Sequence, residues 1–325
     1  MRGIGRYPAV ALLAASALVL GACSSSGTDS SASGSETIEV EDNFGTQTVT
    51  VPPTSVVATD NRTFETLDSW GIPLTAAAVA LMPDTIGYVN DDSIVDIGNH
   101  NEPDLEAIVA ADPDLVINGQ RFQQYRSDIV SLVPDAAVVE LDPREGEPFD
   151  QELKRQVTVL GQIFDRESEA TELGDNLDEQ IERARAAYDP SQTVLAINVS
   201  GGEIGYLAPG VGRTLGPVYD ILDLTPAVQV DGATEDHQGD DISVEAIAAS
   251  NPDWILVLDR DAPLAGEDSA PAAEVITGSQ ALANVTAVRE GNIVYLPADT
   301  YTNEGIQTYT EFFGSFADAL EGSQA

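Results

Sequence analysis

The chain has 325 residues, and its 55 acidic residues against 14 lysines and arginines give a net charge of −41. A surface of this charge repels nucleic acid and anionic lipid, which argues against both as partners. The single cysteine excludes an intramolecular disulfide, so the folded state depends on its hydrophobic core.

Residues 1–22 are predicted to be a lipoprotein signal peptide. Arg2 and Arg6 precede the apolar run "PAVALLAASALVL", which is too short to span a bilayer. The run leads into "LGAC", so Cys23 is expected to become the first mature residue and to carry a lipid. The alternative is an ordinary secretory signal with an incidental cysteine. Residues 23–35 are small and polar, which predicts a flexible tether.

The remaining chain is longer than one hydrophobic core usually serves, so it is expected to form two lobes. In residues 36–149, a hairpin turning at Asn43–Gly45 precedes short apolar strands that alternate with helical stretches. Residues 150–189 show helical periodicity, with a break near 161–164 and a long helix from about Glu167 to Tyr188. The strand–helix alternation then resumes over residues 190–325. We therefore predict an α/β fold of two Rossmann-like lobes joined by one long rigid α-helix.

One segment occurs twice in the chain. Residues 106–117 read "EAIVAADPDLVI" and residues 245–256 read "EAIAASNPDWIL". Each copy predicts a helix that stops before a proline and leads into a buried strand, because residues that precede proline disfavour the helical conformation. Each copy is followed, four residues on, by an arginine: Arg121 or Arg260. Ligands of open parallel sheets bind outside the carboxyl ends of the strands, so these arginines are expected on opposite walls of one cleft. The alternative is that the repeat records only duplication of the fold, with both arginines solvated.

A third arginine, Arg213, lies in the glycine-rich loop "GGEIGYLAPGVGRTLG", which follows a predicted strand. The glycine spacing differs by one residue from that of a dinucleotide-binding loop. Arginine is always charged and offers a planar set of donors, which suits a delocalised anion in a partly dry site. We therefore predict an anionic ligand, with Tyr206, Phe122 and Tyr125 lining its cleft.

Two further residues are candidates for contact with a metal. His237 lies in the loop "EDHQGDD" and Tyr301 follows a predicted strand. A phenolate oxygen suits ferric iron, and an imidazole can complete a coordination sphere. The alternatives are an exposed loop histidine and an ordinarily packed tyrosine. Motifs of nucleophilic or zinc-dependent catalysis are missing from the sequence, so we predict a binding protein and not an enzyme.

With these features the chain resembles the lipid-anchored substrate-binding proteins of iron–siderophore ABC importers, in particular the ferric catecholate and petrobactin branch. The matching motifs are "NEPDLEAI…DPDLVINGQR", "APGVGRTLG", "HQGDDISVEAI" and "NPDWILVLDR", and the resemblance extends from Cys23 to the last helix. It implies the class III periplasmic-binding-protein fold. It also implies that three cleft arginines, here Arg121, Arg213 and Arg260, hold an anionic ferric siderophore.

The resemblance further implies that one glutamate on each lobe, Glu106 and Glu245, docks into the permease. The alternative is a carboxylate that is favoured in the first turn of a helix. One departure concerns the iron contacts: eight residues separate His237 from Glu245, where the related branch has seven, and the loop that carries Tyr301 is about one residue shorter than expected.

The resemblance thus predicts a monomeric protein outside the cytoplasm, held at the outer face of the cell membrane by its lipid alone. It would deliver its ferric siderophore to an ABC permease and, through the permease, serve the ATPase. The alternatives are a haem-binding or cobalamin-binding protein of the same fold, or an extracellular esterase-like enzyme.

Overall fold

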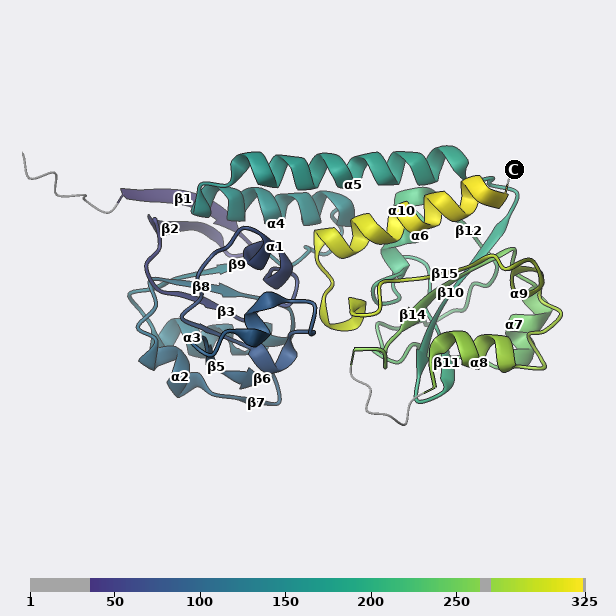
Figure 1. Cartoon of the computed structure of the whole chain (residues 1–325), viewed down its shortest axis with the longest axis horizontal. Helices are drawn as coiled ribbons and strands as arrows, with labels where there is room; N and C mark the ends of the chain where they lie inside the picture. Colours follow the sequence, from purple (N-terminus) through teal and green to yellow (C-terminus); the bar gives the residue numbers. More distant parts are fainter. Residues whose placement is uncertain (1–35, 264–269, 324–325) are drawn as a thin grey trace, which may run out of the picture. The chain divides into compact units, whose positions relative to one another are not determined.

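Two larger sheets, each flanked by helices, organise the residues that the computed structural model describes, 36–263 and 270–323 (Figure 1). The predicted signal peptide, Cys23 and the tether up to residue 35 lie outside these residues. In the described part of the chain, no helix has the length and apolar character needed to cross a membrane.

Lobe one is built on a sheet of five parallel strands in the order β5-β4-β3-β8-β9. Its strands are β3 (Val56–Ala58), β4 (Ala76–Ala77), β5 (Val95–Asp96), β8 (Leu115–Asn118) and β9 (Ala137–Glu140). The predicted hairpin is confirmed as β1 (Glu36–Asp42) and β2 (Gly45–Val51), which pair antiparallel. The other elements of this lobe are α1 (Phe64–Ser69), η1 (Val79–Leu81), η2 (Gly87–Asn90), β6 (Gly98–Asn99), β7 (Glu102–Pro103), α2 (Leu105–Ala110), η3 (Gln120–Tyr125) and α3 (Arg126–Leu132).

Lobe two is built on a mixed sheet in the order β13-β11-β10-β14-β15, with β12 also pairing with β10. Its strands are β10 (Thr193–Ser200), β11 (Glu203–Tyr206), β12 (Thr225–Pro226), β13 (Asp240–Asp241), β14 (Trp254–Asp259) and β15 (Ile293–Tyr295). Its shorter helices are α6 (Gly216–Leu222), α7 (Val244–Ser250), α8 (Ala272–Gly278), α9 (Thr286–Glu290) and η4 (Thr300–Thr302). In β14, Trp254, Leu256 and Leu258 enter one core, whereas Ile255 and Val257 enter another, as expected of a strand that is buried on both faces.

The connection between the lobes contains α4 (Phe149–Phe164) and α5 (Glu167–Ala187), and the chain ends in α10 (Ile306–Ser323). Figure 1 shows α5 lying alongside α4 and α10. The side chains of α4 divide between the two lobes, because Val159 and Leu160 enter the core of lobe one and Leu153 and Val157 enter a core of lobe two. One helix is thus anchored in both lobes.

The helix break predicted near residues 161–164 falls directly after that range. Helix α4 continues through Phe164, and the chain turns at Asp165, whose φ is 56°. Gly161 serves a different purpose: a Cβ there would lie 2.8 Å from the Cβ of Ala170 in α5. The glycine therefore permits the close approach of α4 to α5 and does not end the helix.

The two copies of the repeated segment form matching structures. Each helix is capped by a side chain that accepts a hydrogen bond from the backbone, Asp104 for α2 and Ser243 for α7. Each copy then passes through a residue of positive φ before its proline, Asp112 at 47° and Asn251 at 46°. The repeat thus places β8 and β14, with the arginines beyond them, at equivalent points of the two sheets.

Candidate functional site

The three arginines predicted from the sequence converge on one side chain, Tyr301. Arg121 lies in η3 after β8, Arg213 in the loop between β11 and α6, and Arg260 directly after β14. Their guanidinium carbons lie 4.9, 4.7 and 4.8 Å, respectively, from the centre of the Tyr301 ring. These distances are typical of cation–π contacts. We call Arg121, Arg213 and Arg260 the arginine cluster.

Tyr301 lies in η4 and is only 5% exposed. Burial opposes ionisation of its phenol, but a hydrogen bond from Arg260 and the three guanidinium charges outweigh this and lower its pKa. The cluster therefore stabilises negative charge at its centre. That property suits an anionic ligand and a phenolate donor alike.

A buried carboxylate, Glu304, lies beneath the arginine cluster. Its two oxygens accept hydrogen bonds from Arg213 at 3.2 and 2.9 Å, from the Thr214 hydroxyl at 2.5 Å and from the Gln120 amide at 2.8 Å. Arg62 approaches to 3.7 Å. Burial alone would raise the pKa of Glu304, but the charges of Arg213 and Arg62 and these hydrogen bonds lower it to about 2. Glu304 is therefore ionised at neutral pH.

A second ion pair adjoins the first. Arg62 Nη1 donates to Asp142 at 2.9 Å, and the backbone N–H of Gln120 donates to the same carboxylate. Arg62, Arg213, Asp142 and Glu304 thus balance one another in charge. The Arg260 guanidinium lies 3.5 Å from the carboxylate of Asp261, so among the described residues the charge without a carboxylate partner belongs to Arg121.

Arg121 is the arginine with the least compensation. Within the described residues its guanidinium pairs with no carboxylate, and its hydrogen bond runs from Nη2 to the carbonyl of Tyr301 at 2.9 Å. Burial and the nearby charge of Arg213 lower its pKa. The Nε atoms of Arg121 and Arg260 are both buried and have no hydrogen-bond partner in the described part of the chain. The cluster therefore holds unused donors and an excess of positive charge.

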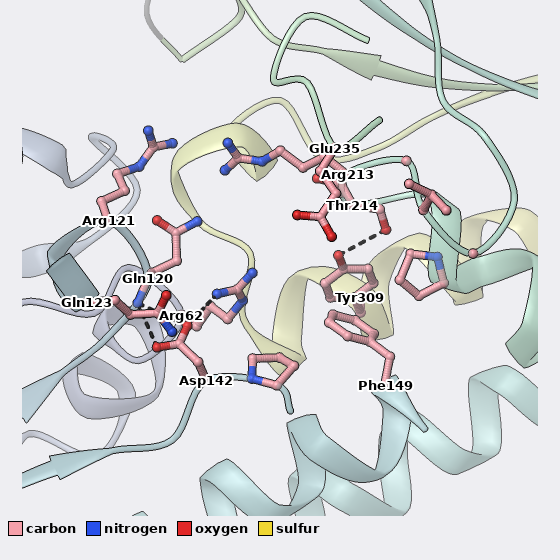
Figure 2. Close-up of a pocket in the computed structure, with 15 residues that line it drawn as sticks. Arg62, Gln120, Arg121, Gln123, Asp142, Phe149, Arg213, Thr214, Glu235 and Tyr309 are labelled. Atoms are coloured by element: carbon pink, nitrogen blue, oxygen red, sulfur yellow. Dashed lines mark hydrogen bonds and ion pairs between the residues drawn. The ribbon is translucent and has the colours of Figure 1, made fainter. Parts of the chain in front are cut away.

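A cavity of about 460 Å³ opens beside this cluster. Figure 2 shows that Arg121 and Gln120 reach it from lobe one, whereas Arg213 and Thr214 reach it from lobe two. Arg62 and Asp142 lie at the same cavity. Arg260 directly follows β14, and Tyr301 lies in η4, the first helix after β15. The site is thus formed at the carboxyl ends of strands from both sheets.

The structure corrects two of the predicted lining residues. Phe122 is fully buried and packs in the core of lobe one. Tyr206 is 1% exposed, packs in a core of lobe two, and donates its hydroxyl hydrogen to the carbonyl of Val228 at 2.7 Å. Neither ring faces the cleft. Tyr125 is partly exposed, and its hydroxyl donates to the carbonyl of His100 at 2.7 Å.

The other predicted residues lie as follows. The side chain of His237 is 52% exposed, with Nδ1 3.9 Å from the carboxylate of Asp236. Glu106 and Glu245 are exposed in the first turns of α2 and α7, at equivalent positions of the repeat. No group of three or more histidine, cysteine or acidic side chains in residues 36–263 and 270–323 is arranged to hold a metal ion.

Sequence reasoning missed Glu304, Arg62, Gln120, Asp142 and His100. Burial and the charges of Arg121 and Arg213 lower the pKa of His100, which places this imidazole within electrostatic reach of the cluster. Arg62 was visible as an arginine outside the central helices, soon after a predicted strand. The carboxylates carried no comparable signal, because 55 acidic residues are spread along the chain.

Known proteins resemble the chain over most of its length. The petrobactin-binding protein YclQ of Bacillus subtilis is 27% identical over 314 residues, which cover 94% of this chain and 96% of YclQ. The ferric-anguibactin-binding protein FatB of Vibrio anguillarum is 26% identical over 267 residues, which cover 81% of each chain.

Solved structures agree in fold. The crystal structure of YclQ matches with a TM-score of 0.75 at 25% identity and covers 88% of this chain and 99% of its own. The catecholate-siderophore binding protein VctP from Vibrio cholerae matches with a TM-score of 0.75 at 22% identity over 86% of this chain and 99% of its own, a likeness of fold alone. These structures share the class III arrangement of two α/β lobes joined through a long helical connection. The family model for periplasmic binding proteins matches residues 56–300, and the chain therefore belongs to that family.

Proposed function

We propose that the protein captures an anionic ferric siderophore, of the catecholate type, and delivers it to an ABC permease. Proteins of this family bind substrates outside the cytoplasm. The observation that carries the proposal is the convergence of three guanidinium groups within 4.9 Å of the Tyr301 ring centre, in a chain of net charge −41. A local excess of positive charge in so acidic a protein selects an anion.

The arginine cluster would neutralise the ferric complex, and the buried Nε donors of Arg121 and Arg260 would gain acceptors from it. Catecholate oxygens are charged and planar, which suits the fork of the guanidinium group. Tyr301 and His237 would supply oxygen and nitrogen donors to iron whose coordination the siderophore leaves incomplete. YclQ and FatB carry the names of a petrobactin binder and a ferric-anguibactin binder, which supports iron-bound cargo.

The remaining parts of the proposal concern the cell. Cys23 would carry the lipid that holds the protein, as a monomer, at the outer face of the membrane. Glu106 and Glu245 are equivalent, exposed positions on the two lobes, and each would meet the permease. Replacement of Cys23 by alanine should release the protein from the membrane fraction. The protein acts by binding and transfer, without turnover of the ligand.

The test is a titration of the purified protein with ferric catecholate, mixed citrate–catecholate and hydroxamate complexes. Binding is followed by quenching of the two tryptophans and by calorimetry. We expect saturable binding of anionic catecholate complexes that weakens as salt is added. The triple variant Arg121→Gln, Arg213→Gln, Arg260→Gln should not bind them. If no complex in the panel binds to the wild-type protein, the proposed function is wrong.

A further inference from the structure

We propose that Glu304 is a positioning residue of the ligand site: it fixes Arg213 directly and fixes Arg121 through Gln120, so that the arginines are held at a set spacing across the cleft. The inference rests on the proposed function and assigns a role to a buried group that does not itself meet the ligand.

The hydrogen-bonding capacity of Glu304 is used up inside the protein. A carboxylate offers about four lone-pair sites. Two accept from Arg213, one from Thr214 and one from Gln120. The side chain is 3% exposed. Glu304 therefore has neither a free acceptor nor a surface to offer a ligand, and it acts through the groups that it holds.

Two constraints set the orientation of the Arg213 guanidinium. Nε and Nη2 both donate to Glu304, which defines the plane of the group, and the ring of Tyr301 lies 4.7 Å from its central carbon. A guanidinium carries five N–H donors, so about three remain for the cavity. Without the carboxylate, a long side chain would lose most of this ordering and would have to regain it on binding the ligand.

Glu304 also reaches the opposite lobe. It lies in the segment that follows η4, after the last strand of lobe two, yet Gln120 of η3 in lobe one donates to it at 2.8 Å. The next residue, Arg121, donates to the carbonyl of Tyr301 at 2.9 Å. Two neighbouring residues of lobe one are thus bonded to one short segment of lobe two. This pair of bonds defines the spacing between Arg121 and Arg213.

The test uses Glu304→Gln, which keeps the shape of the side chain and removes its charge. A purely electrostatic view predicts tighter binding of an anion, because the site becomes more positive. The positioning role predicts the opposite sign: affinity for a ferric catecholate should fall at least about tenfold. The probe is the tightest-binding ferric complex of the wild-type panel, measured by calorimetry.

The matched control is Glu152→Gln. Glu152 in α4 is also 3% exposed, also binds two arginines, Arg144 and Arg155, and its pKa is likewise lowered to about 2, against the effect of burial, by hydrogen bonds from Arg144 and Arg155. In the described residues Glu152 makes no hydrogen bond or ion pair with Arg121, Arg213 or Arg260. Glu152→Gln should cost comparable stability and leave ligand affinity within about twofold of the wild type. If Glu152→Gln lost as much affinity as Glu304→Gln, general destabilisation would explain both losses, and the inference would be overturned.

A double-mutant cycle gives a readout that a structural role would not move. Because Glu304 acts through Arg213 and, by way of Gln120, through Arg121, the loss of affinity caused by Glu304→Gln should be clearly smaller in an Arg213→Gln background than in the wild type. Additive losses, or unchanged or tighter binding by Glu304→Gln, overturn the inference. If Arg213→Gln fails to fold, the affinities of Glu304→Gln and Glu152→Gln are by themselves the test of the inference. Failure of the wild-type protein to bind any complex is a different outcome: it refutes the proposed function, and the inference falls with it.

Discussion

Two members of the arginine cluster should have opposite effects on the stability of the ligand-free protein. Arg213 pairs with buried Glu304, and although burial lowers its pKa, the charge of that carboxylate raises it by more. Arg121 has no carboxylate partner among the described residues, and burial and the charge of Arg213 lower its pKa. The folded state therefore favours the charge of Arg213 and disfavours the charge of Arg121.

The perturbation is replacement by methionine, which keeps much of the apolar stem. Arg213→Met leaves Glu304 buried without its main partner, and breaking such a pair on one side costs about 3–5 kcal/mol of the free energy of unfolding. Arg121→Met removes a buried charge and gives up one hydrogen bond to a carbonyl. These effects oppose each other, so its free energy of unfolding should stay within about 1 kcal/mol of the wild type.

The assay is urea unfolding of the ligand-free protein at pH 7, followed by both circular dichroism and tryptophan fluorescence to test for a single transition. Arg289→Met is the control, because Arg289 is 56% exposed and lies 3.9 Å from its partner Glu290. Both cluster variants should lose affinity for the ferric complex. A destabilisation by Arg121→Met as large as that by Arg213→Met would refute the assignment of charge compensation within the site.

Three further predictions concern pH, docking and motion. Burial and the neighbouring Asp142 raise the pKa of Asp60 to about 8 from an ordinary value of 3.8. Between these two values the folded protein keeps a proton that the unfolded chain releases. The free energy of unfolding should therefore fall as the pH rises from about 4 to about 8. Asp60→Asn should therefore change the free energy of unfolding little at pH 4 and increase it at pH 8; equal effects at both values would contradict this. Glu106→Arg and Glu245→Arg should each reduce iron uptake by cells without altering the affinity of the purified protein, whereas Glu290→Arg, also exposed on a helix, should change neither. Solution scattering with and without ligand should show little change in the radius of gyration, because α4 is anchored in both lobes, and a large compaction would count against that constraint.

The short-range features of the chain were open to prediction because they depend on neighbours in sequence. A capping residue stands two positions before each copy of the repeated segment, and each copy carries its own proline and apolar strand. The equivalence of α2–β8 and α7–β14 therefore follows from local preferences. Parallel sheets place the carboxyl ends of strands at one edge, which brought Arg121, Arg213 and Arg260 into one hypothesis. The structure does bring these three side chains together.

Other features were decided by packing between distant parts of the chain. Gly161 lies in the range where a helix break was predicted, but it is the point where α4 approaches α5 closely. Tyr206 looked like a lining residue, but at the end of β11 its ring is buried in a core of lobe two. A glycine or a tyrosine has the same local preferences in either setting, and only the neighbouring elements determine which setting applies.

The sequence by itself therefore determined the elements, their duplication and the cationic character of the cleft. The tertiary structure alone decided how that charge is balanced. Glu304 accepts hydrogen bonds from Arg213, which is 91 residues away in the sequence, and from Gln120, which is 184 residues away. No spacing or motif in the sequence connects these residues. Because electrostatic and hydrogen-bond energies depend on distance in space, only the folded chain determines which of the 55 acidic residues hold the site together.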